Sequence, residues 1–315
     1  MFTPAVYEWG LDVIRAFQTL SSPPLDGVVK ILTRLGDPVV GIGVALFIYW
    51  CVDKKKGFKF FFLLFLAFAL NVAMKALLKV PRPFLLDPAV ALIPETGFST
   101  PSGHAQGSAA FWTLLGWICF TKHRRTGAAL AVVVPVVVSL TRVYLGVHVP
   151  TDVLLGLAAG YLSALGGIHF YDPLGARISP LRPSFKALLI AALCFCLNAL
   201  SGGEVNASGA LFGFTLGYVL LRAGRAAGTE HGLEAAGDAR GTAAGVAPPR
   251  DGGALFRKLL HLGAGGLVCS VTYLGPRVGA YAAGLGDNPL VGFIRYALVG
   301  FAAAFIVPRM LSRLS

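Results

Sequence analysis

Charged side chains are scarce in this 315-residue chain, in which Asp, Glu, Lys and Arg together make up 13% of the residues and hydrophobic side chains 56%. The mean hydropathy is correspondingly high, at +0.71. A typical soluble domain contains about 25% charged residues, so this composition excludes an ordinary soluble protein. It predicts an integral membrane protein instead.

Three further features are missing from the sequence. No CxxC pair occurs, and the five cysteines lie within or at the ends of apolar runs, so we expect no disulfide and no zinc site. We also expect no cofactor. No repeat of fixed period is found. Glu8, Asp12 and Arg15 stand where a cleaved signal peptide would have a basic region followed by an apolar core, so we expect no such peptide.

Long apolar runs dominate what is present. A helix needs roughly 20 apolar residues to cross a bilayer, and about nine runs approach that length. They lie at about 36–52, 57–79, 104–121, 127–143, 150–172, 186–202, 205–222, 257–276 and 287–308. We therefore expect an all-α fold: a polytopic membrane helix bundle with about nine transmembrane helices.

The segments between and before these runs predict the organisation of the chain. The N-terminal residues Val6, Trp9, Ile14, Phe17 and Leu20 fit one face of a helix, which favours an amphipathic helix on the membrane surface over a short extra span. Alanine and glycine dominate the stretch before Pro248-Pro249, which predicts a flexible cytoplasmic loop. The expected parts are an interfacial segment at 1–35, a core of five spans at 36–172, two spans at 173–223, the loop at 224–254 and two spans at 255–315.

The distribution of Lys and Arg predicts the orientation. If the first span runs from outside to inside, most basic residues fall on the cytoplasmic side, as the positive-inside rule requires. These residues include Lys54 to Lys56, Lys122 to Arg125, Arg177 to Lys186 and Arg222 to Lys258. Loops of this kind account for the net charge of +12, so we expect no nucleic-acid partner.

Three polar segments then lie at span ends on the outer side. In the first, Lys75 falls in the last turns of a helix, whereas Pro81 and Pro83 hold Arg82 on an extended segment. Both cations can reach one anion from different sides. The alternative is that they extend to lipid headgroups, and this alternative is favoured for Lys79 alone.

In the second segment, Ser102, Gly103 and His104 stand where a loop becomes a helix. Backbone N–H groups at a helix start bind anions, and glycine allows close approach. An ordinary Ser N-cap is the alternative for these residues alone. In the third segment, Arg142 precedes His148 and Asp152, whose spacing allows the carboxylate to orient the imidazole as a nucleophile.

Together the three segments place three cations, a helix start and two histidines on one side of the membrane. Cations and backbone donors suit a phosphate group, a histidine paired with a carboxylate suits covalent attack, and a second histidine suits protonation of the leaving oxygen. This combination predicts a phosphoryl-transfer site that needs no metal.

The same residues resemble the type-2 phosphatidic acid phosphatase superfamily, which includes lipid phosphate phosphatases, glucose-6-phosphatase and vanadium haloperoxidases. Its three blocks are KxxxxxxRP, PSGH and SRxxxxxHxxxD. Here they read Lys75 to Pro83, Pro101 to His104, and Thr141 to Asp152. Thr141 replaces the usual Ser of the third block, which keeps a hydroxyl and adds a methyl group. The resemblance covers about residues 36–172.

The resemblance implies that His148 attacks phosphorus, that Asp152 orients it, and that His104 protonates the leaving group and then activates water. It implies that the phosphate oxygens are bound by Lys75, Arg82, Ser102, Gly103 and Arg142.

These expectations favour a membrane phosphatase that hydrolyses a lipid phosphate: phosphatidate, phosphatidylglycerol phosphate, a polyprenyl pyrophosphate or a sphingoid-base phosphate. The bilayer is then its other partner, and a bacterial inner membrane, with the site facing the periplasm or exterior, is the expected location. Three alternatives stay open. They are a sugar-phosphate phosphatase of the glucose-6-phosphatase type, a lipid phosphotransferase and a non-enzymatic lipid transporter.

Overall fold

The structure is a computed structural model that describes residues 4–226, 252–285 and 288–312. Every regular element in these ranges is helical, which confirms the predicted all-α class. The N-terminal segment forms α1 (Pro4–Gln18), α2 (Pro23–Leu32) and a 3-10 turn, η1 (Thr33–Gly36). Two further 3-10 turns, η2 (Pro83–Leu85) and η3 (Pro88–Val90), lie in the loop after the fourth helix.

Each of the nine apolar runs forms a helix. They are α3 (Pro38–Cys51), α4 (Lys54–Leu78), α5 (Gly103–Cys119), α6 (Arg124–Tyr144), α7 (Pro150–Ile178), α8 (Pro183–Leu200), α9 (Asn206–Ala226), α11 (Gly252–Ala282) and α12 (Pro289–Phe301), which continues through the π-helical turn η4 (Ala302–Ile306) into α13 (Val307–Leu311).

Length and hydropathy together support fewer spans than nine. Among the described residues, six helices are long and apolar enough to cross a membrane. A seventh is added if the segments Pro23–Gly36 and Pro38–Cys51, bent by 45° at their junction, count as one span. Helix α5, with 17 residues, is shorter than the roughly 20 residues of a standard span. The integral-membrane class therefore stands, but the count of nine is not confirmed.

The chain divides into two compact units. Unit 1 consists of Met1–Ala45, Lys59–Arg177 and Leu197–Glu204, and unit 2 of Leu46–Phe58, Ile178–Cys196 and Val205–Ser315. All predicted site residues belong to unit 1. The five-part division expected from the sequence stays a prediction. Helix α9 extends to Ala226 and α11 begins at Gly252, and the rest of the loop predicted at 224–254 lies outside the described residues.

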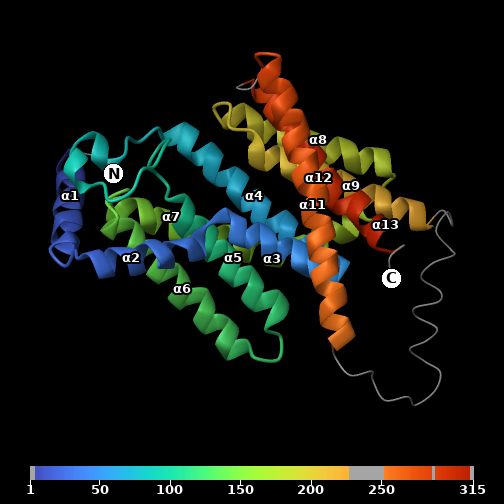
Figure 1. The fold of residues 1–315 in the computed structure, drawn as a ribbon, viewed down its shortest axis with the longest axis horizontal. Helices are drawn as coiled ribbons and strands as arrows, with labels where there is room; N and C mark the ends of the chain where they lie inside the picture. Colours follow the sequence, from blue (N-terminus) through green and yellow to red (C-terminus); the bar gives the residue numbers. More distant parts are fainter. Residues whose placement is uncertain (1–3, 227–251, 286–287, 313–315) are drawn as a thin grey trace. The chain divides into compact units, whose positions relative to one another are not determined.

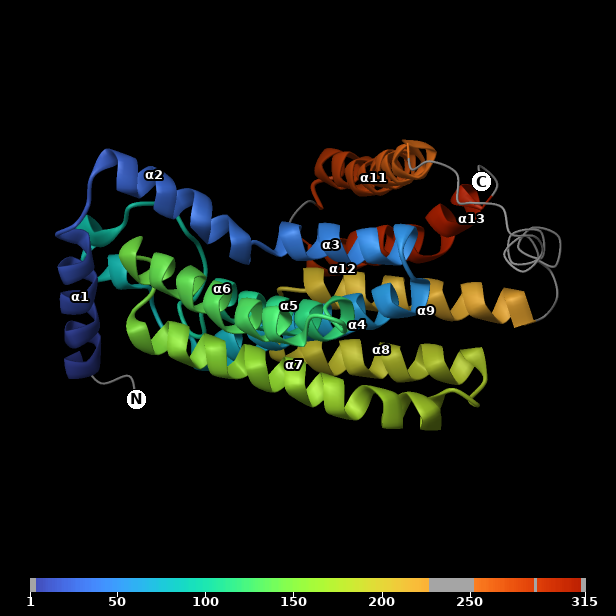
Figure 2. The same cartoon turned by 90° about the horizontal axis from the view of Figure 1, so that it is seen from below.

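Glycines bring the helices of unit 1 into close contact. Helices α5 and α6 run side by side (Figures 1 and 2), and a Cβ on Gly116 would lie 2.8 Å from the carbonyl oxygen of Gly127. Helix α7 approaches the start of α5 in the same way. A Cβ on Gly156 would lie 2.7 Å from the Ser102 carbonyl oxygen, and one on Gly160 would lie 2.4 Å from that of Gln106. Only glycine permits backbones to approach this closely.

Helix α1 lies across the ends of α6 and α7 (Figures 1 and 2) and packs against the core of unit 1. Its buried face consists of Tyr7, Leu11 and Ile14, which join an apolar cluster with residues of α6, α7 and the loop after α4. Trp9 and Leu20 are 51% and 68% exposed. Tyr7, Leu11 and Ile14 therefore form the face that packs against the protein, and the location of the helix at the membrane surface stays a prediction.

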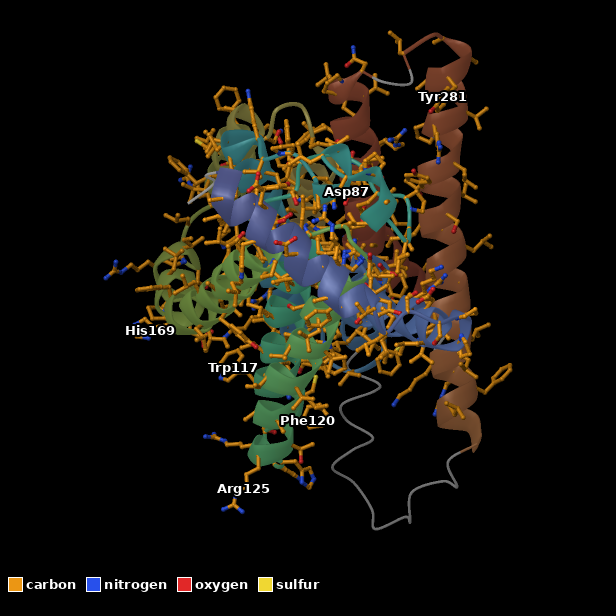
Figure 3. The ribbon with its side chains drawn as sticks, turned by 90° about the vertical axis from the view of Figure 1, so that its left-hand side faces the viewer. Asp87, Trp117, Phe120, Arg125, His169 and Tyr281 are labelled. Carbon is orange, nitrogen blue, oxygen red and sulfur yellow. The ribbon has the colours of Figure 1, made fainter. Side chains whose placement is uncertain are left out.

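Polar contacts fasten α1 to the loop after α4. The Tyr7 hydroxyl donates to the carbonyl oxygen of Pro81. Arg15 forms an ion pair with Asp87 at 2.8 Å, and Figure 3 shows Asp87 beside α1. Gln18 Nε2 donates to two carbonyl oxygens at 2.8 Å, those of Val90 and Tyr144. Helix α1 therefore holds the loop after α4 beside the end of α6.

Unit 2 is organised around the π-helical turn that follows α12. A π turn leaves carbonyl groups without their usual α-helical partners, and side chains of α3 use them. Tyr49 Oη donates to Ala304 O at 2.9 Å, and Trp50 Nε1 donates to Ala303 O at 2.9 Å. Helices α9 and α12 pack closely, since a Cβ on Gly213 would lie 1.8 Å from the Ala297 carbonyl oxygen.

The close contact between α7 and α5 can be tested with a matched pair of substitutions on α7. Gly160→Ala forces a methyl group against a backbone carbonyl and should lower the free energy of unfolding by about 2 kcal/mol. Gly166→Ala adds the same methyl group where no atom lies within 4 Å, and should raise it by about 0.5 kcal/mol through helix propensity. Thermal unfolding in detergent measures both, and equal shifts would contradict the packing described.

Candidate active site

Residues 80–102, between α4 and α5, form the loop on which much of the site is built. Pro81 and Pro83 flank Arg82, whose backbone is extended at φ −80° and ψ 153°. Ser99 N–H donates to Val80 O at 2.8 Å and closes the loop, and Leu92 N–H donates to Leu145 O at 3.1 Å. The loop thus lies against the turn between α6 and α7.

A glycine allows this contact between the loop and the turn. Gly146 has φ +70°, a conformation that other residues rarely adopt, and a Cβ there would lie 1.7 Å from the carbonyl oxygen of Val90. No other residue fits this position without moving the backbone. The turn that carries His148 is therefore held at a fixed distance from the loop.

His148 is buried, and its two ring nitrogens have different partners. Nδ1 lies 3.2 Å from Ser99 Oγ and 3.5 Å from Asp152 Oδ2. Nε2 lies 3.3 Å from Nη1 of Arg82, which can only donate. These partners assign the ring hydrogen to Nδ1 and leave Nε2 unprotonated. An unprotonated ring nitrogen beside a guanidinium is what nucleophilic attack on an anionic ester requires.

Asp152, near the start of α7, is fully buried and collects several donors. Its carboxylate accepts hydrogen bonds from Ser99 Oγ at 2.5 Å, from the Val149 N–H at 3.0 Å and from Thr100 Oγ1. Its backbone oxygen accepts from the Ser102 N–H at 3.0 Å. Asp152 therefore acts on His148 both directly and through the hydroxyl of Ser99.

The Arg82 guanidinium is held by backbone carbonyl groups. Nε donates to Gly97 O at 3.0 Å, Nη2 to Thr96 O at 2.7 Å and Nη1 to Val147 O at 3.2 Å. These bonds brace the loop against the turn and fix the direction of Nη1 toward His148. A planar guanidinium is suited to this task because its donors have fixed directions.

Arg142, in the last turn of α6, is buried and shares a carboxylate with Arg82. Nη2 of Arg142 donates to Glu95, and its Nη1 donates to Thr33 Oγ1 at 3.1 Å. The other Glu95 oxygen lies 3.9 Å from Arg82 Nη2. Arg142 Nε is buried and has no hydrogen-bond partner among the described residues. The two arginines thus face the carboxylate of Glu95, and the Nε–H of Arg142 is a donor that a second anion could use.

Lys75 and the start of α5 complete the predicted set. Lys75 Nζ donates to the carbonyl oxygens of Phe98 and, at 3.1 Å, Ser99. Ser102 is the N-cap of α5, and its hydroxyl accepts from the Ala105 N–H at 3.5 Å, as in the alternative considered from sequence. Gly103 is the first residue of the helix. Binding of phosphate by these three residues stays a prediction.

His104 is the second histidine of the predicted pair. Its Nε2 lies 2.9 Å from Oδ1 of Asp37, a residue between η1 and α3. A chain of contacts therefore connects the predicted residues. Lys75 and Ser102 contact the group formed by Ser99, Asp152 and His148. Arg82 and Arg142 both contact Glu95, and the turn of residues 33–37 contacts both His104 and Arg142.

The burial of His148 determines its charge. Desolvation outweighs the hydrogen bond and charge of Asp152, and it lowers the pKa of His148 from 6.5 to about 3. The imidazole is therefore neutral at physiological pH. Burial would raise the pKa of Glu95, but the charges of Arg142 and Arg82 and the hydrogen bond from Arg142 bring it below its usual value. Glu95 is thus ionised and contacts both arginines.

Four residues of this network were missed from sequence. Ser99 and Thr100 directly precede the Pro-Ser-Gly-His block. The feature that could have identified them in the sequence is a pair of adjacent hydroxyl side chains next to a motif. Glu95 and Asp37 are single acidic residues at the borders of apolar runs, a position that predicts a solvated surface as readily as a partner. Among the described residues, no group of three or more His, Cys, Asp or Glu side chains has metal-binding geometry.

Comparisons with known proteins agree with the motifs. The model of the PAP2 superfamily matches residues 56–176. Phosphatidylglycerophosphatase B of Bacillus subtilis (strain 168) is 30% identical over 176 residues, which cover 51% of this chain and 82% of that protein. An undecaprenyl-diphosphatase of Sulfolobus acidocaldarius is 32% identical over 146 residues, 43% of this chain and 66% of that protein.

A solved structure is also similar. The crystal structure of a transmembrane PAP2-type phosphatidylglycerolphosphate phosphatase from Bacillus subtilis is 29% identical, with a TM-score of 0.47, and the match covers 55% of this chain and 89% of that one. The chain belongs to the PAP2 superfamily. It is an integral membrane hydrolase of phosphoric monoesters or diphosphates, and the resemblance inferred from its three motifs is confirmed.

The low pKa of His148 predicts how stability depends on pH. An unfolded chain protonates this ring near pH 6.5, whereas the folded protein does so only near pH 3. Between these values the unfolded state binds more protons, so acidification lowers the free energy of unfolding. We expect Tm to fall from pH 6.5 to pH 4, and to fall less in His148→Gln. His123→Gln, on an exposed turn, is the control and should keep the wild-type slope.

The Glu95 carboxylate predicts a second effect. Glu95→Gln keeps the shape of the side chain but removes the charge that would compete with phosphate if Arg142 and Arg82 bind phosphate as predicted. The inhibition constant for inorganic phosphate should fall about fivefold, which corresponds to about 1 kcal/mol for this mostly buried pair. Asp87→Asn removes a carboxylate from an arginine at α1 and should leave this constant unchanged. Weaker inhibition in Glu95→Gln would mean that the carboxylate helps to bind phosphate.

Proposed function

We propose that the protein hydrolyses a lipid phosphate through a phosphohistidine intermediate at the extracytoplasmic face of the membrane, without a metal ion. The observation that carries the proposal is the pairing of His148, with Asp152 and Ser99 at Nδ1 and the Arg82 guanidinium at Nε2. That arrangement supports attack by a neutral, oriented nitrogen on an anionic ester.

In the proposed first step, Nε2 of His148 forms a bond to phosphorus while the bond from phosphorus to the leaving oxygen breaks. His104 gives a proton to that oxygen. Lys75, Arg82, Arg142, Ser102 and Gly103 bind the remaining phosphate oxygens. The three cations offset the charge that develops on these oxygens, the task that a metal ion performs in other phosphatases.

In the second step, water attacks the phosphohistidine, and the bond between phosphorus and Nε2 breaks. His104, now neutral, takes the proton from that water and returns to its starting state. His148 is again neutral, with its hydrogen on Nδ1. The step releases inorganic phosphate, so the two steps together consume one water and leave the enzyme unchanged.

A lipid substrate fits the setting of the site. The residues proposed to bind phosphate lie at the ends of membrane helices, where an apolar tail can stay in the bilayer. The names of the relatives point the same way, since one is a phosphatidylglycerophosphatase and another an undecaprenyl-diphosphatase. We infer that this chain acts on a related phosphorylated lipid.

The orientation supports an extracytoplasmic site. Figure 3 shows Arg125 at the far end of α6 and Trp117 and Phe120 at the far end of α5, away from Asp87 and the loop after α4. The basic turn that contains Arg125 belongs on the cytoplasmic side by the positive-inside rule. The opposite end, with Arg82 and His148, then faces the periplasm or exterior of a bacterial inner membrane.

Phosphate release by the purified protein in detergent with EDTA tests the proposal. The panel contains phosphatidate, phosphatidylglycerol phosphate, undecaprenyl pyrophosphate, sphingosine phosphate and glucose 6-phosphate. We expect release from at least one lipid, at least 1,000-fold less in His148→Ala, and acid-labile labelling of the wild type by a ³²P-lipid. Release from glucose 6-phosphate alone would favour a sugar phosphatase, and loss of activity in EDTA would contradict the metal-free mechanism.

A further inference from the structure

The site contains a second histidine–carboxylate pair that none of the three sequence motifs includes. His104 Nε2 lies 2.9 Å from Asp37 Oδ1, and the two residues are 67 positions apart in the chain. The His104 side chain is 20% exposed and that of Asp37 39% exposed. We propose that Asp37 is a positioning residue that orients His104 and stabilises its protonated form, so that His104 can protonate the leaving oxygen.

The backbone around Asp37 fixes the carboxylate beside His104. The 3-10 turn η1 ends at Gly36, and Asp37 is extended at φ −67° and ψ 134° before α3 begins. Its N–H donates to Arg34 O at 3.0 Å, and its own carbonyl oxygen accepts from the Val40 N–H at 3.1 Å. Asp37 is therefore held by backbone hydrogen bonds on both sides.

Close packing brings this turn to the start of α5. A Cβ on Gly36 would lie 2.7 Å from Val138 Cγ1 and 3.2 Å from the carbonyl oxygen of His104. Glycine is therefore the residue that lets the turn pass between α6 and the first turn of α5. The same turn reaches Arg142 through the hydroxyl of Thr33. One short segment thus contacts two residues of the proposed phosphate site.

The contact defines which nitrogen of His104 transfers the proton. A carboxylate can only accept, so Nε2 carries a hydrogen that it donates to Asp37, and Nδ1 is the nitrogen available for proton transfer. The arrangement is the counterpart of that at His148, where Nδ1 is held and Nε2 is available. A carboxylate beside an imidazole favours its charged form and fixes the ring orientation.

This inference rests on the proposed function and adds one proton path to it. When the phosphorus–oxygen bond breaks, the proton on Nδ1 of His104 moves to the leaving alcohol. When water attacks the phosphohistidine, its proton moves to Nδ1. Nε2 keeps its hydrogen, and Asp37 keeps its negative charge, through both steps. No oxidant, reductant or further reactant is needed.

The inference predicts a dependence on the leaving group. An alcohol leaves as a strongly basic alkoxide unless it is protonated, whereas a nitrophenol leaves readily as its anion. Loss of Asp37 should therefore slow the cleavage of an alkyl phosphate and spare that of a nitrophenyl phosphate. A purely structural defect would slow both alike, so the ratio of the two rates reports on the proton transfer.

The experiment uses the full chain in detergent and two substrates with the same tail, dodecyl phosphate and a nitrophenyl phosphate carrying a dodecyl group. In Asp37→Asn we expect kcat for dodecyl phosphate to fall about 30-fold with KM within about twofold, and kcat for the nitrophenyl ester to stay within about threefold. Asp26→Asn, a carboxylate of α2 that binds Tyr144 and Ser21, is the matched control and should leave both rates unchanged.

Two further variants test the path itself. Asp37→Asn should have no further effect in a His104→Gln background, because its whole action passes through that ring. Asp37→Glu keeps a carboxylate, and should restore part of the rate on dodecyl phosphate even if Asp37→Asn folds poorly. Equal losses on both substrates, or additive losses in the double variant, would overturn the role of Asp37.

The proposed function can fail separately. If His148→Ala retains activity, the phosphohistidine mechanism falls, and the proton path through His104 falls with it. If His148→Ala is inactive on both substrates while Asp37→Asn behaves as the wild type, only the positioning role of Asp37 is overturned.

Discussion

The buried carboxylate of Asp152 is the contact on which the arrangement of the site depends. A carboxylate accepts about four hydrogen bonds, and Asp152 uses this capacity on hydroxyl and backbone donors from two separate segments while it faces His148. Its backbone oxygen binds the N-cap residue of α5. A charge this deeply buried is costly unless it is well partnered, so the loop after α4, the start of α5 and the turn before α7 must stay together for the unit to be stable.

The arginines extend this constraint in a different way. Arg82 donates to carbonyl groups of the loop after α4 and of the turn before α7, and so connects these two segments in addition to supplying a positive charge. Arg142 has fewer protein partners: it donates to Thr33 and to the carboxylate of Glu95, and its Nε has no hydrogen-bond partner among the described residues. Preorganised cations act strongly because the protein has already oriented them before the substrate binds. The Arg82 guanidinium is oriented by backbone carbonyl groups, whereas that of Arg142 is oriented by the side chains of Thr33 and Glu95.

Sequence reasoning identified the helices and the motif residues but not the contacts between them. The nine apolar runs and the residues Lys75, Arg82, His104, Arg142, His148 and Asp152 could be predicted because hydropathy and spacing are local properties. The partners Glu95 and Asp37 could not, because a single acidic residue has no spacing that identifies a partner 47 or 67 positions away. The face by which α1 packs against the protein could not be predicted either, since Tyr7 is buried by contacts that only the fold creates.

The two histidines of the site illustrate why such long-range contacts matter for chemistry. His148 and His104 belong to different motifs, yet each has one ring nitrogen beside an acidic residue. The environments differ in burial, because Asp152 is fully buried, whereas Asp37 is partly exposed. In the mechanism proposed above, His148 reacts as a neutral nucleophile and His104 as an acid that carries a proton, so the same pair of residue types would serve opposite roles. The two pairs lie at two helix junctions, since the turn before α7 carries His148 and Asp37 directly precedes α3 beside His104.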